Sequence, residues 1–383
     1  MPVEDMEPYP MTASTITERI GEAQANLDAG DFEAARAEYE AILAQDSSIA
    51  EAMTGLGDCC FGLGEYGISE DAYRDALEDA PLNPDALFGL AAVLRVTECY
   101  EESVALYERG FEVEPERTEA YWELAYSREM LGDTVGAERA YRSCLVDHPT
   151  HGMATHLLAA MTGAKTHRAP SDYVRDLFDD YADTFDADLV NDLNYVVPQL
   201  IESSLSAHLT EHPCSETPPF KRVLDLGCGT GLVAESIRPL GAYITGVDLS
   251  SKMLEIAVSK NRIDKAIVSD MVDFLNSPEN HDNFDLIVCG DALVYLGSLE
   301  EVFTGVTRRL GNMGVFCFTV EDLAEGDFSL RPTGRYAHQK KYITDLLIGS
   351  NQTVLHSVAN VPRNDSHQEI PGRLFVSQKR PSG

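Results

Sequence analysis

The chain has 383 residues, which is enough for more than one domain, and its apolar share of 44% is sufficient for packed cores. Its formal net charge is -35 at pH 7. Such a surface repels phosphate backbones at long range, which argues against a nucleic-acid partner unless a local basic patch exists. Solubility in a salty cytoplasm explains the acidity equally well.

The first residues of the chain show no targeting signal. Residues 1–15 contain no basic segment followed by an apolar run, so we expect no signal peptide and a disordered or extended segment. No apolar stretch is long enough to cross a bilayer, which predicts a cytoplasmic protein with no membrane partner. The 8 cysteines include no Cys-x-x-Cys pair, so free thiols and no metal site are expected.

Four kinds of residue recur every 34 positions across the first 150 residues. They are a glycine replaced once by glutamate, a small residue, a tyrosine and a proline: Gly30, Gly64, Glu98 and Gly132; Ala35, Ser69, Ser103 and Ala137; Tyr39, Tyr73, Tyr107 and Tyr141; Pro81, Pro115 and Pro149. This is the tetratricopeptide (TPR) pattern, in which each unit is a pair of antiparallel helices. Four units start near residues 16, 50, 84 and 118, and an apolar helix at 153–161 would cover the last. We therefore predict an all-α TPR solenoid over residues 16–164.

The first helices of these units are expected to form an aromatic and acidic groove. Its predicted members are Phe61, Phe88, Trp122, Tyr126, Glu51, Asp58, Asp85, Glu119 and Glu129, with Arg95 as the main opposing charge. Such a groove suits a basic protein or peptide partner, or self-association. A solvated acidic face with scattered aromatics is an equally simple interpretation.

Residues 165–219 read as a linker that contains helices. Tyr173, Leu177, Tyr181, Phe185 and Leu189 recur every four residues, which indicates helices laid over the following domain. The polar, proline-bearing stretch at 212–219 would connect these helices to the first strand of that domain, 220–383.

An apolar strand over residues 222–226 leads directly into three closely spaced glycines. These are Gly227, Gly229 and Gly231, and Asp225 stands just ahead of them. Glycines at this spacing let the backbone turn sharply and lie flat against a bound cofactor. A tight strand-to-helix turn with no ligand is the simpler alternative.

Asp248 ends the next apolar run, about twenty residues after the glycines. A carboxylate at this distance can accept hydrogen bonds from a ribose diol. A nicotinamide fingerprint would place its third glycine where this chain has Leu232, so a pyrophosphate site is disfavoured. The two features together indicate a nucleotide-type cofactor.

Residues 222–318 resemble class I S-adenosylmethionine (SAM) methyltransferases, because four motifs follow in order at suitable spacing. The resemblance implies SAM as cofactor, S-adenosylhomocysteine (SAH) as product, and contacts from Asp225, Gly227, Cys228, Gly229, Gly231, Asp248, Leu249, Met253, Asp270, Met271 and Gly290. In this family Asp248 would bind the ribose hydroxyls, and Asp270 and Met271 would contact adenine. A helix preceding the domain closes over SAM in the family, so Tyr181 and Phe185 would contact cofactor or acceptor, with helix packing as the alternative.

The residues after 220 alternate between apolar runs and helical patterns, as in an α/β doubly wound sheet. Seven strands are predicted near 222–226, 242–247, 266–269, 284–289, 315–320, 353–358 and 373–378. A helix over 296–310 would end at Gly311. The expected fold is therefore a Rossmann-like seven-stranded domain whose last two strands form a hairpin.

Methyl transfer needs a base only when the acceptor must first lose a proton. The catalytic candidates by position are His338, Asp291 and Tyr295, while Glu321 and Tyr336 are candidates for acceptor binding. Structural roles are the alternatives for His338 and Asp291.

The segment LRPTGRYAHQKKYITDLL and GRLFV near residue 372 are similar to a bacterial group of TPR-bearing methyltransferases. The leading functional prediction is methyl transfer from SAM to a small-molecule acceptor, with the repeats shaping the acceptor side or mediating assembly. A protein methyltransferase whose repeats recruit its substrate, and a TPR scaffold with a regulatory SAM-binding domain, are the two alternatives. The accepting atom stays open between oxygen, nitrogen, sulfur and carbon.

Overall fold

The computed structural model describes residues 13–182, 184–191, 195–213, 215–279, 282–362, 364–365 and 368–381. Most of the predicted N-terminal segment, 1–15, lies outside the described residues. The chain separates into two compact units, which divide between Thr155 and His156. This division precedes the boundary expected at residue 164, and the predicted domain limits stay predictions.

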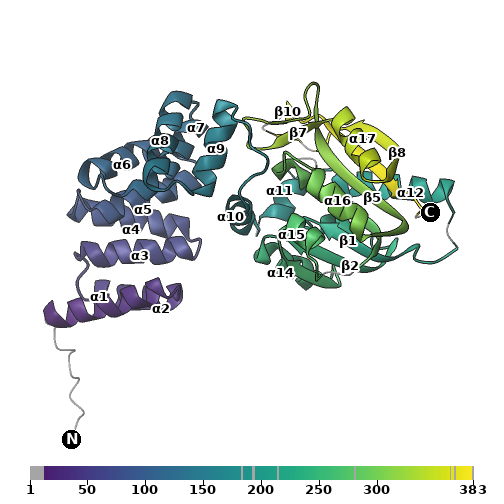
Figure 1. Ribbon diagram of the computed structural model, residues 1–383. Helices are drawn as coiled ribbons and strands as arrows, with labels where there is room; N and C mark the ends of the chain where they lie inside the picture. The colour runs from purple at the N-terminus through teal and green to yellow at the C-terminus, as the bar shows by residue number, and fades with distance from the viewer. Residues whose placement is uncertain are drawn as a thin grey trace, which may run out of the picture. The chain divides into compact units, whose positions relative to one another are not determined.

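The N-terminal unit is a succession of helical hairpins (Figure 1). Its helices are α1 (Ala13–Asp28), α2 (Phe32–Leu43), α3 (Ala50–Gly62), α4 (Tyr66–Asp79), α5 (Pro84–Val96), α6 (Tyr100–Val113), the short 3-10 helix η1 (Thr118–Ala120), α7 (Tyr121–Met130) and α8 (Thr134–Asp147), and α9 (Gly152–Thr162) follows. From α1 to α8, each α-helix packs on the next one along the chain. The predicted all-helical TPR region is therefore confirmed.

The turn inside each hairpin requires a left-handed backbone conformation. Gly30, Gly64 and Gly132 have φ angles of 76°, 74° and 76°, and Glu98 at the equivalent place has a φ of 63°. Glycine adopts this conformation freely, whereas a residue with a Cβ is disfavoured there by about 1 kcal/mol. The repeat of glycine every 34 residues thus reflects a backbone requirement, which the third unit meets with a strained glutamate.

The recurring small residues and tyrosines fill the contacts between helices. Ser69 Oγ donates to the carbonyl of Gly57 at 2.7 Å, and one repeat later Ser103 Oγ donates to that of Ala91 at 2.8 Å. The four recurring tyrosines are buried. These positions are therefore structural.

Several residues predicted for the groove are instead packed between helices. Phe88 is buried and meets Phe111 edge-on, with ring centroids 5.1 Å apart. Asp58 accepts a hydrogen bond of 2.5 Å from the Tyr73 hydroxyl. Arg95 lies 5.1 Å above the Trp122 ring. This corrects the expectation for Phe88, which helix packing occupies; Asp58 is half-exposed, and its place in the groove stays a prediction.

The C-terminal unit is built on a mixed sheet. Its strands are β1 (Phe220–Leu226), β2 (Gly241–Asp248), β3 (Lys265–Val268), β4 (Phe284–Cys289), β5 (Leu310–Leu323), β6 (Phe328–Leu330), β7 (Tyr336–Gln339), β8 (Gln352–Asn360) and β11 (Gly372–Lys379), while β9 (Asn364–Asp365) and β10 (Gln368–Glu369) pair separately. The strand order along the main path is β3-β2-β1-β4-β5-β11-β8. Strands β1 to β5 run parallel, and β11 is antiparallel to both β5 and β8. The predicted seven-stranded doubly wound topology is confirmed.

Helices cover both faces of this sheet (Figure 1). One core joins α15 (Met271–Asn276), α16 (Glu300–Arg309) and α17 (Lys340–Gly349) to one side of the strands. The other joins α12 (Val197–Glu211), α13 (Leu232–Ser236) and α14 (Ser251–Ser259) to the opposite side. Along β1, Leu224 and Leu226 belong to the first core and Val223 to the second, as the alternation of a strand requires.

Two local elements differ from the sequence prediction. The helix expected over 296–310 ends at Arg309, and β5 begins at Leu310, where it pairs with Phe284 of β4. The segment before Lys340 forms the hairpin β6–β7, whose second strand extends the sheet beside the end of β5. These short strands carry no apolar run of their own, and their pairing with β5 is what makes them extended.

Two helices precede the sheet in sequence, α10 (Ser171–Tyr181) and α11 (Phe185–Asn191). We refer to α10 and α11 as the lid helices, and α10 packs on α14. Over the ranges that the structure describes, no helix combines the length and apolarity needed to cross a membrane.

Candidate functional site

A cavity of about 240 Å³ opens beyond the carboxyl ends of β1 to β4. Strand order reverses between β1 and β4, because β2 and β3 lie on one side of β1 whereas β5 lies beyond β4. Ligands of doubly wound sheets bind at this switch point. The sheet side contributes the loops after each strand, and the opposite wall comes from the lid helices.

The loop after β1 brings three glycines together for different reasons. All three have positive φ angles, 65° at Gly227, 52° at Gly229 and 83° at Gly231. A Cβ on Gly227 would lie 2.4 Å from Ala292 Cβ, and a Cβ on Gly231 would lie 2.9 Å from Arg262 Cβ. At Gly229 the closest atom would belong to Phe185 of the lid, 3.7 Å away, so this glycine faces the cavity.

Asp248 connects the end of β2 to the glycine loop. Its carboxylate accepts hydrogen bonds from the backbone N–H groups of Gly229, at 2.8 Å, and Ser250, at 3.0 Å. The N–H of Leu249 also faces this carboxylate, which lines the cavity and retains acceptor capacity for a further donor there. Burial raises the pKa of Asp248, although these backbone donors act against the shift.

Asp225 lies behind the glycine loop and does not line the cavity. It is 1% exposed, and neither carboxylate oxygen has a hydrogen-bond partner. Burial raises its pKa to about 7, and the charge of Asp248 adds to the shift. The resemblance predicted that Asp225 contacts the cofactor, whereas the structure places it beneath the loop, outside the cavity lining.

The loop after β3 contributes Asp270 and Met271 to the cavity wall. Asp270 caps α15 by accepting from Val272 N at 2.9 Å. Its second oxygen forms an ion pair with Arg168 and accepts from Ser171 Oγ at 3.3 Å. This carboxylate thus ties the entry of α10 to the sheet.

The lid helices present an aromatic and aliphatic wall to the cavity. Val174, Leu177, Phe178 and Tyr181 of α10 line it at helical spacing, and Phe185 and Leu189 of α11 continue the surface. Phe178 meets Tyr295 edge-on at 5.5 Å, so the lid contacts the loop after β4. The predicted positions of Tyr181 and Phe185 beside the cavity agree with the structure.

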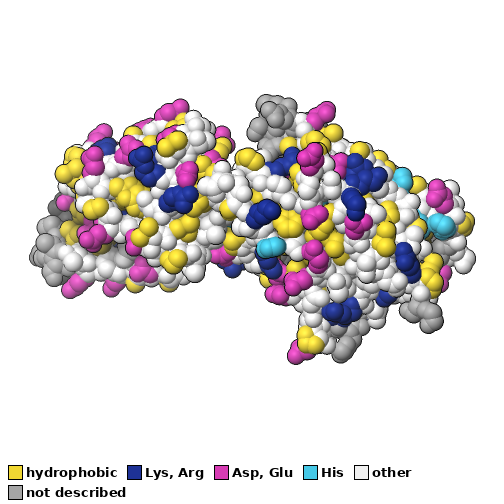
Figure 2. Space-filling model, turned by 45° about the horizontal axis from the view of Figure 1, so that its top comes forward, with side chains coloured by type: hydrophobic (Ala, Val, Ile, Leu, Met, Phe, Trp, Pro, Cys, Tyr) yellow, Lys and Arg dark blue, Asp and Glu magenta, His cyan; other side chains and the backbone are white. Residues whose placement is uncertain are grey.

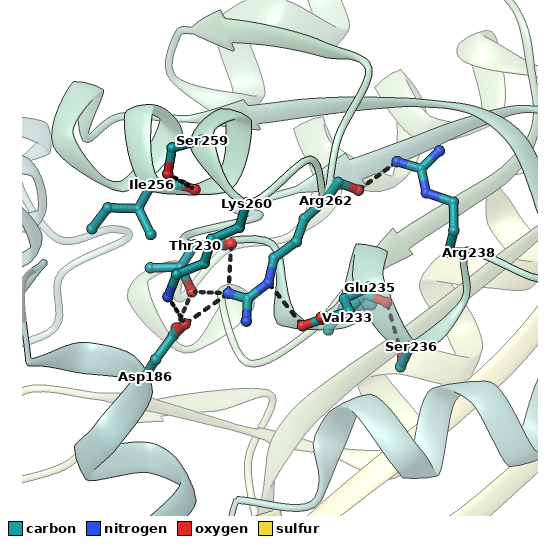
Figure 3. Close-up of polar contacts among 10 residues, drawn as sticks. All are labelled: Asp186, Thr230, Val233, Glu235, Ser236, Arg238, Ile256, Ser259, Lys260 and Arg262. Atoms are coloured by element: carbon teal, nitrogen blue, oxygen red, sulfur yellow. Dashed lines mark hydrogen bonds and ion pairs between the residues drawn. The ribbon is translucent and has the colours of Figure 1, made fainter.

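Polar contacts hold α11 against the glycine loop, with Asp186 at their centre (Figure 3). Its carboxylate accepts from Lys260 Nζ at 2.6 Å, from Arg262 Nη1 at 2.7 Å and from the Thr230 hydroxyl. Burial alone would raise the pKa of Asp186, but these donors outweigh it and hold the pKa below its usual range. A separate bond of 2.5 Å from Ser250 Oγ to Asp179 holds α10.

The remaining predicted cofactor residues divide into two groups. Cys228, Leu249 and Gly290 line the cavity. Met253 is buried inside α14 and Gly231 packs against Arg262, so neither faces the cavity.

The loop after β4 carries two of the three predicted catalytic residues. Asp291 and Tyr295 both line the cavity. Asp291 has a φ of 57°, and its N–H donates to Thr319 Oγ1 at 2.9 Å. The strained backbone directs this residue toward the cavity rather than into the start of a helix.

His338 lies elsewhere, on β7. Its side chain is fully buried, and Nε2 bonds the carbonyl of Gly297 at 3.1 Å. Burial lowers the pKa of His338 to about 4. Because it does not border the cavity, we do not include it among the groups that act on an acceptor.

Tyr336 and Glu321 are also held away from the cavity by packing. Tyr336 is buried against Ala159 and Leu330, and its hydroxyl lies 2.5 Å from Thr166 Oγ1. Glu321 of β5 is 1% exposed and lies 3.8 Å from Arg331. Neither position supports the predicted acceptor contact, because Tyr336 lies within the β6–β7 hairpin and Glu321 pairs with it, away from the cavity lining.

Sequence reasoning missed Phe178, Arg168 and Arg335, which line the cavity. Of the period-four stripe, Leu177, Tyr181, Phe185 and Leu189 line the cavity, whereas Tyr173 packs on His156, with ring centroids 4.7 Å apart. Val174 and Phe178 widen this stripe at three- and four-residue spacing, and that signal could have been read from the sequence. Arg335 gives no local signal, because only the hairpin fold brings it to the cavity. No group of three His, Cys, Asp or Glu side chains suited to a metal ion occurs within the described ranges.

Comparison with known proteins identifies both parts of the chain. Residues 224–318 match the family model described as a methyltransferase domain, and residues 20–67 and 61–109 match the tetratricopeptide repeat. The chain therefore carries a methyltransferase domain preceded by TPR repeats.

Individual relatives match over shorter stretches. YqeM of Bacillus subtilis (strain 168) is 31% identical over 153 residues, which is 37% of this chain and 60% of that protein. Ubiquinone biosynthesis O-methyltransferase of Vibrio atlanticus (strain LGP32) is 26% identical over 137 residues, or 31% of this chain and 56% of that enzyme. The chain thus spans about half the length of the curated relatives it matches. The structure of magnesium protoporphyrin IX methyltransferase from Synechocystis PCC 6803 with bound SAM aligns with a TM-score of 0.42 and 16% identity, covering 55% of this chain and 96% of that one.

Proposed function

We propose that the C-terminal unit transfers a methyl group from SAM to a small-molecule acceptor. The observation that carries the proposal is the cavity at the sheet's switch point, where Gly229 and the carboxylate of Asp248 lie side by side. This arrangement accompanies the match of residues 224–318 to a methyltransferase domain.

The residues around the glycine loop fit an adenosyl cofactor. A Cβ on Gly229 would enter the cavity, so glycine leaves room for a ligand against the backbone. Asp248 has the free lone pairs that two ribose hydroxyls would use. Met271 and Leu249 supply apolar contacts on the same side, where an adenine ring would lie.

The sulfonium of SAM supplies an already activated methyl group, so the protein mainly has to align the acceptor and exclude water. The lid helices exclude water with the apolar faces of Phe178 and Phe185. Asp186 and Asp179 hold those helices down through their bonds to the glycine loop and to Ser250. Asp291 and Tyr295, on the β4 side, are positioned to orient an acceptor or to accept its proton.

The mixed charges on the face of the molecule that Figure 2 shows are consistent with a small acceptor. On the face seen in Figure 2, Lys and Arg side chains are interspersed with Asp and Glu rather than gathered. The cavity is lined mainly by apolar and aromatic side chains, which suits an organic molecule with an apolar body.

Calorimetric titration with SAM, SAH and NAD tests the cofactor. We expect micromolar binding of SAM and SAH and no response to NAD. Asp248→Asn should bind SAM and SAH at least about tenfold more weakly, because an amide has one accepting oxygen where the carboxylate has two. Glu255→Gln, which removes an exposed carboxylate from α14, is the matched control and should bind like the wild type. Absence of adenosyl binding in the wild type would contradict the proposal and favour a TPR scaffold.

Partition of tritiated methyl groups tests the acceptor class. After incubation of the protein with labelled SAM and a cell lysate, label should enter the small-molecule fraction. Label found in protein instead would support the alternative in which the TPR unit recruits a protein substrate.

A further inference from the structure

Two arginines line the cavity, and they differ in what they contact. Arg168 forms an ion pair with Asp270 and donates to Ser171 Oγ. Arg335 forms no ion pair with any residue that the structure describes, and its buried Nη1 has no hydrogen-bond partner. A charged guanidinium nitrogen that is removed from water and left unpaired destabilises the protein, because its lost hydration is not replaced. Arg335 is half-exposed as a whole, and among the described residues no anion pairs with its guanidinium.

The backbone around Arg335 is rigid. Arg331 N donates to the carbonyl of Arg335 at 2.8 Å, and Gly334 N donates to that of Arg331 at 3.0 Å, closing the β6–β7 turn. The carbonyl of Gly334 bonds His156 Nε2 at 2.7 Å. The turn thus presents the Arg335 side chain to the cavity from a fixed base, without a flexible loop that could move it into solvent.

Arg335 stands on the side of the cavity opposite the predicted adenosine contacts. Asp248 and Asp270 follow β2 and β3, which lie on one side of β1. Arg335 directly precedes β7, which pairs with the end of β5 on the other side. Asp291 and Tyr295, after β4, lie between these two sides. The unpaired cation therefore borders the space left for the acceptor.

We infer that Arg335 binds a carboxylate carried by the methyl acceptor, and that the acceptor is a small organic acid with an apolar or aromatic body. The inference rests on the proposed function. A planar guanidinium matches a carboxylate with two parallel hydrogen bonds, which would satisfy the buried Nη1. Phe178, Tyr181 and Phe185 supply the apolar contacts for the rest of the molecule.

Titration of organic acids into the SAH-saturated protein tests this inference. The probes are benzoate, 4-hydroxybenzoate, phenylacetate and octanoate, each paired with its neutral amide. We expect at least one acid to bind roughly tenfold more tightly than its amide, because the amide cannot neutralise the guanidinium. Equal binding of acids and amides, or binding of no acid, would overturn the inference.

Variants at the same hairpin separate the inference from the proposed function. Arg335→Gln should lose the preference for the acid, and Arg335→Lys should keep part of it, because lysine retains the charge but not the fork. Lys340→Gln, which removes an exposed positive charge five positions later, should bind the acids like the wild type. SAH binding should stay within about threefold of the wild type in all three variants.

Two results would contradict the assignment of Arg335 to the acceptor. A loss of SAH binding of about tenfold or more in Arg335→Gln would show that Arg335 binds the carboxylate of the cofactor. Unchanged acid binding in this variant would show that another group binds the acids. If the wild type bound neither SAM nor SAH, the proposed function itself would fail, which is a separate outcome.

Discussion

The two units of this protein treat their buried polar side chains differently. In the TPR unit, Tyr39, Tyr73 and Tyr141 direct their hydroxyls to Gln24, Asp58 and Glu129, so the repeat satisfies its own polar groups. In the methyltransferase unit, Asp225 and Arg335 keep buried polar atoms with no partner, one beneath the glycine loop and one beside the cavity. A polar group satisfied within the fold stabilises it, whereas one left open marks a place where a ligand or a charge change has a large effect.

The third repeat is the exception within the TPR unit. Tyr107 is buried, and its hydroxyl faces Glu123 and Arg95 without hydrogen-bond geometry to any described residue. At the repeat position where Asp58 accepts from Tyr73, the third repeat has Ala92, which offers no acceptor to Tyr107. The following repeat has Glu123 where the third has Gly89, and Glu123 lies 3.7 Å from Arg95. Burial raises the pKa of Glu123, against the effect of Arg95. The same unit also contains the strained Glu98, so the third repeat departs from its neighbours in turn and core.

The largest loss of stability is expected at Gly89 of α5, which lies against the ring of Tyr73. A Cβ on Gly89 would lie 2.4 Å from Tyr73 Cζ, so Gly89→Ala should destabilise the TPR unit by about 3 kcal/mol. Urea unfolding followed by the fluorescence of Trp122, the single tryptophan of the chain, reports on this unit. Gly67→Ala on α4 is the control, because nothing lies within 4 Å of its added Cβ, and it should be neutral or slightly stabilising. Equal losses in both variants would contradict close packing at Gly89.

The next effect concerns Asp225 and depends on pH. Its folded pKa of about 7 lies above the unfolded value of about 3.9, so its contribution to stability is fully present below pH 4 and is lost as pH rises through 7. Asp225→Asn removes this titration and should gain on the order of 2 kcal/mol relative to the wild type between pH 5 and pH 8. Calorimetric scans of the transition that SAH shifts provide the measurement, with exposed Asp273→Asn as control. A constant difference between variant and wild type across that range would contradict the raised pKa.

Two tyrosine substitutions sharpen the contrast between paired and unpaired hydroxyls. Tyr73→Phe should cost about 1 kcal/mol at pH 8, because it leaves the half-buried carboxylate of Asp58 without its donor. Burial raises the pKa of Asp58 to about 6, so the carboxyl is ionised at that pH. Tyr107→Phe removes a hydroxyl with no partner and should be neutral or stabilising. Equal losses of unfolding free energy in the two variants, measured by the same urea unfolding, would show that the Tyr107 hydroxyl does have a hydrogen-bond partner.

The smallest effect is expected at the lid. Asp186→Asn weakens the bonds of α11 to Lys260 and Arg262, so SAH should dissociate roughly fivefold faster while the unit stays folded. Stopped-flow displacement of SAH measures this rate. Asp188→Asn, on the same helix, is the control and should leave the rate unchanged. An unaltered rate in Asp186→Asn would mean that the apolar contacts of Phe185 hold the lid without the polar ones.

Much of the site could be predicted because its residues lie next to strand ends in the sequence. Gly229, Asp248, Asp270 and Asp291 each follow a strand of the parallel sheet, and parallel strands end at one edge. Tyr336 was misplaced because the residues beside it in the sequence do not show that it pairs with Leu330 of β6 and packs on Ala159. The roles of the residues that line the cavity in binding and catalysis are predictions.

The sequence by itself determined both folds. The 34-residue period places glycines where the helical hairpins need a left-handed turn, and the glycine loop has glycines where a side chain would collide with its neighbours. These features depend on local backbone geometry, which neighbouring residues specify. Only the tertiary structure decided that His338 is a buried neighbour of Gly297 and that Arg335 reaches the cavity unpaired. Which polar groups find partners depends on segments brought together from distant parts of the chain, and no local pattern records that outcome.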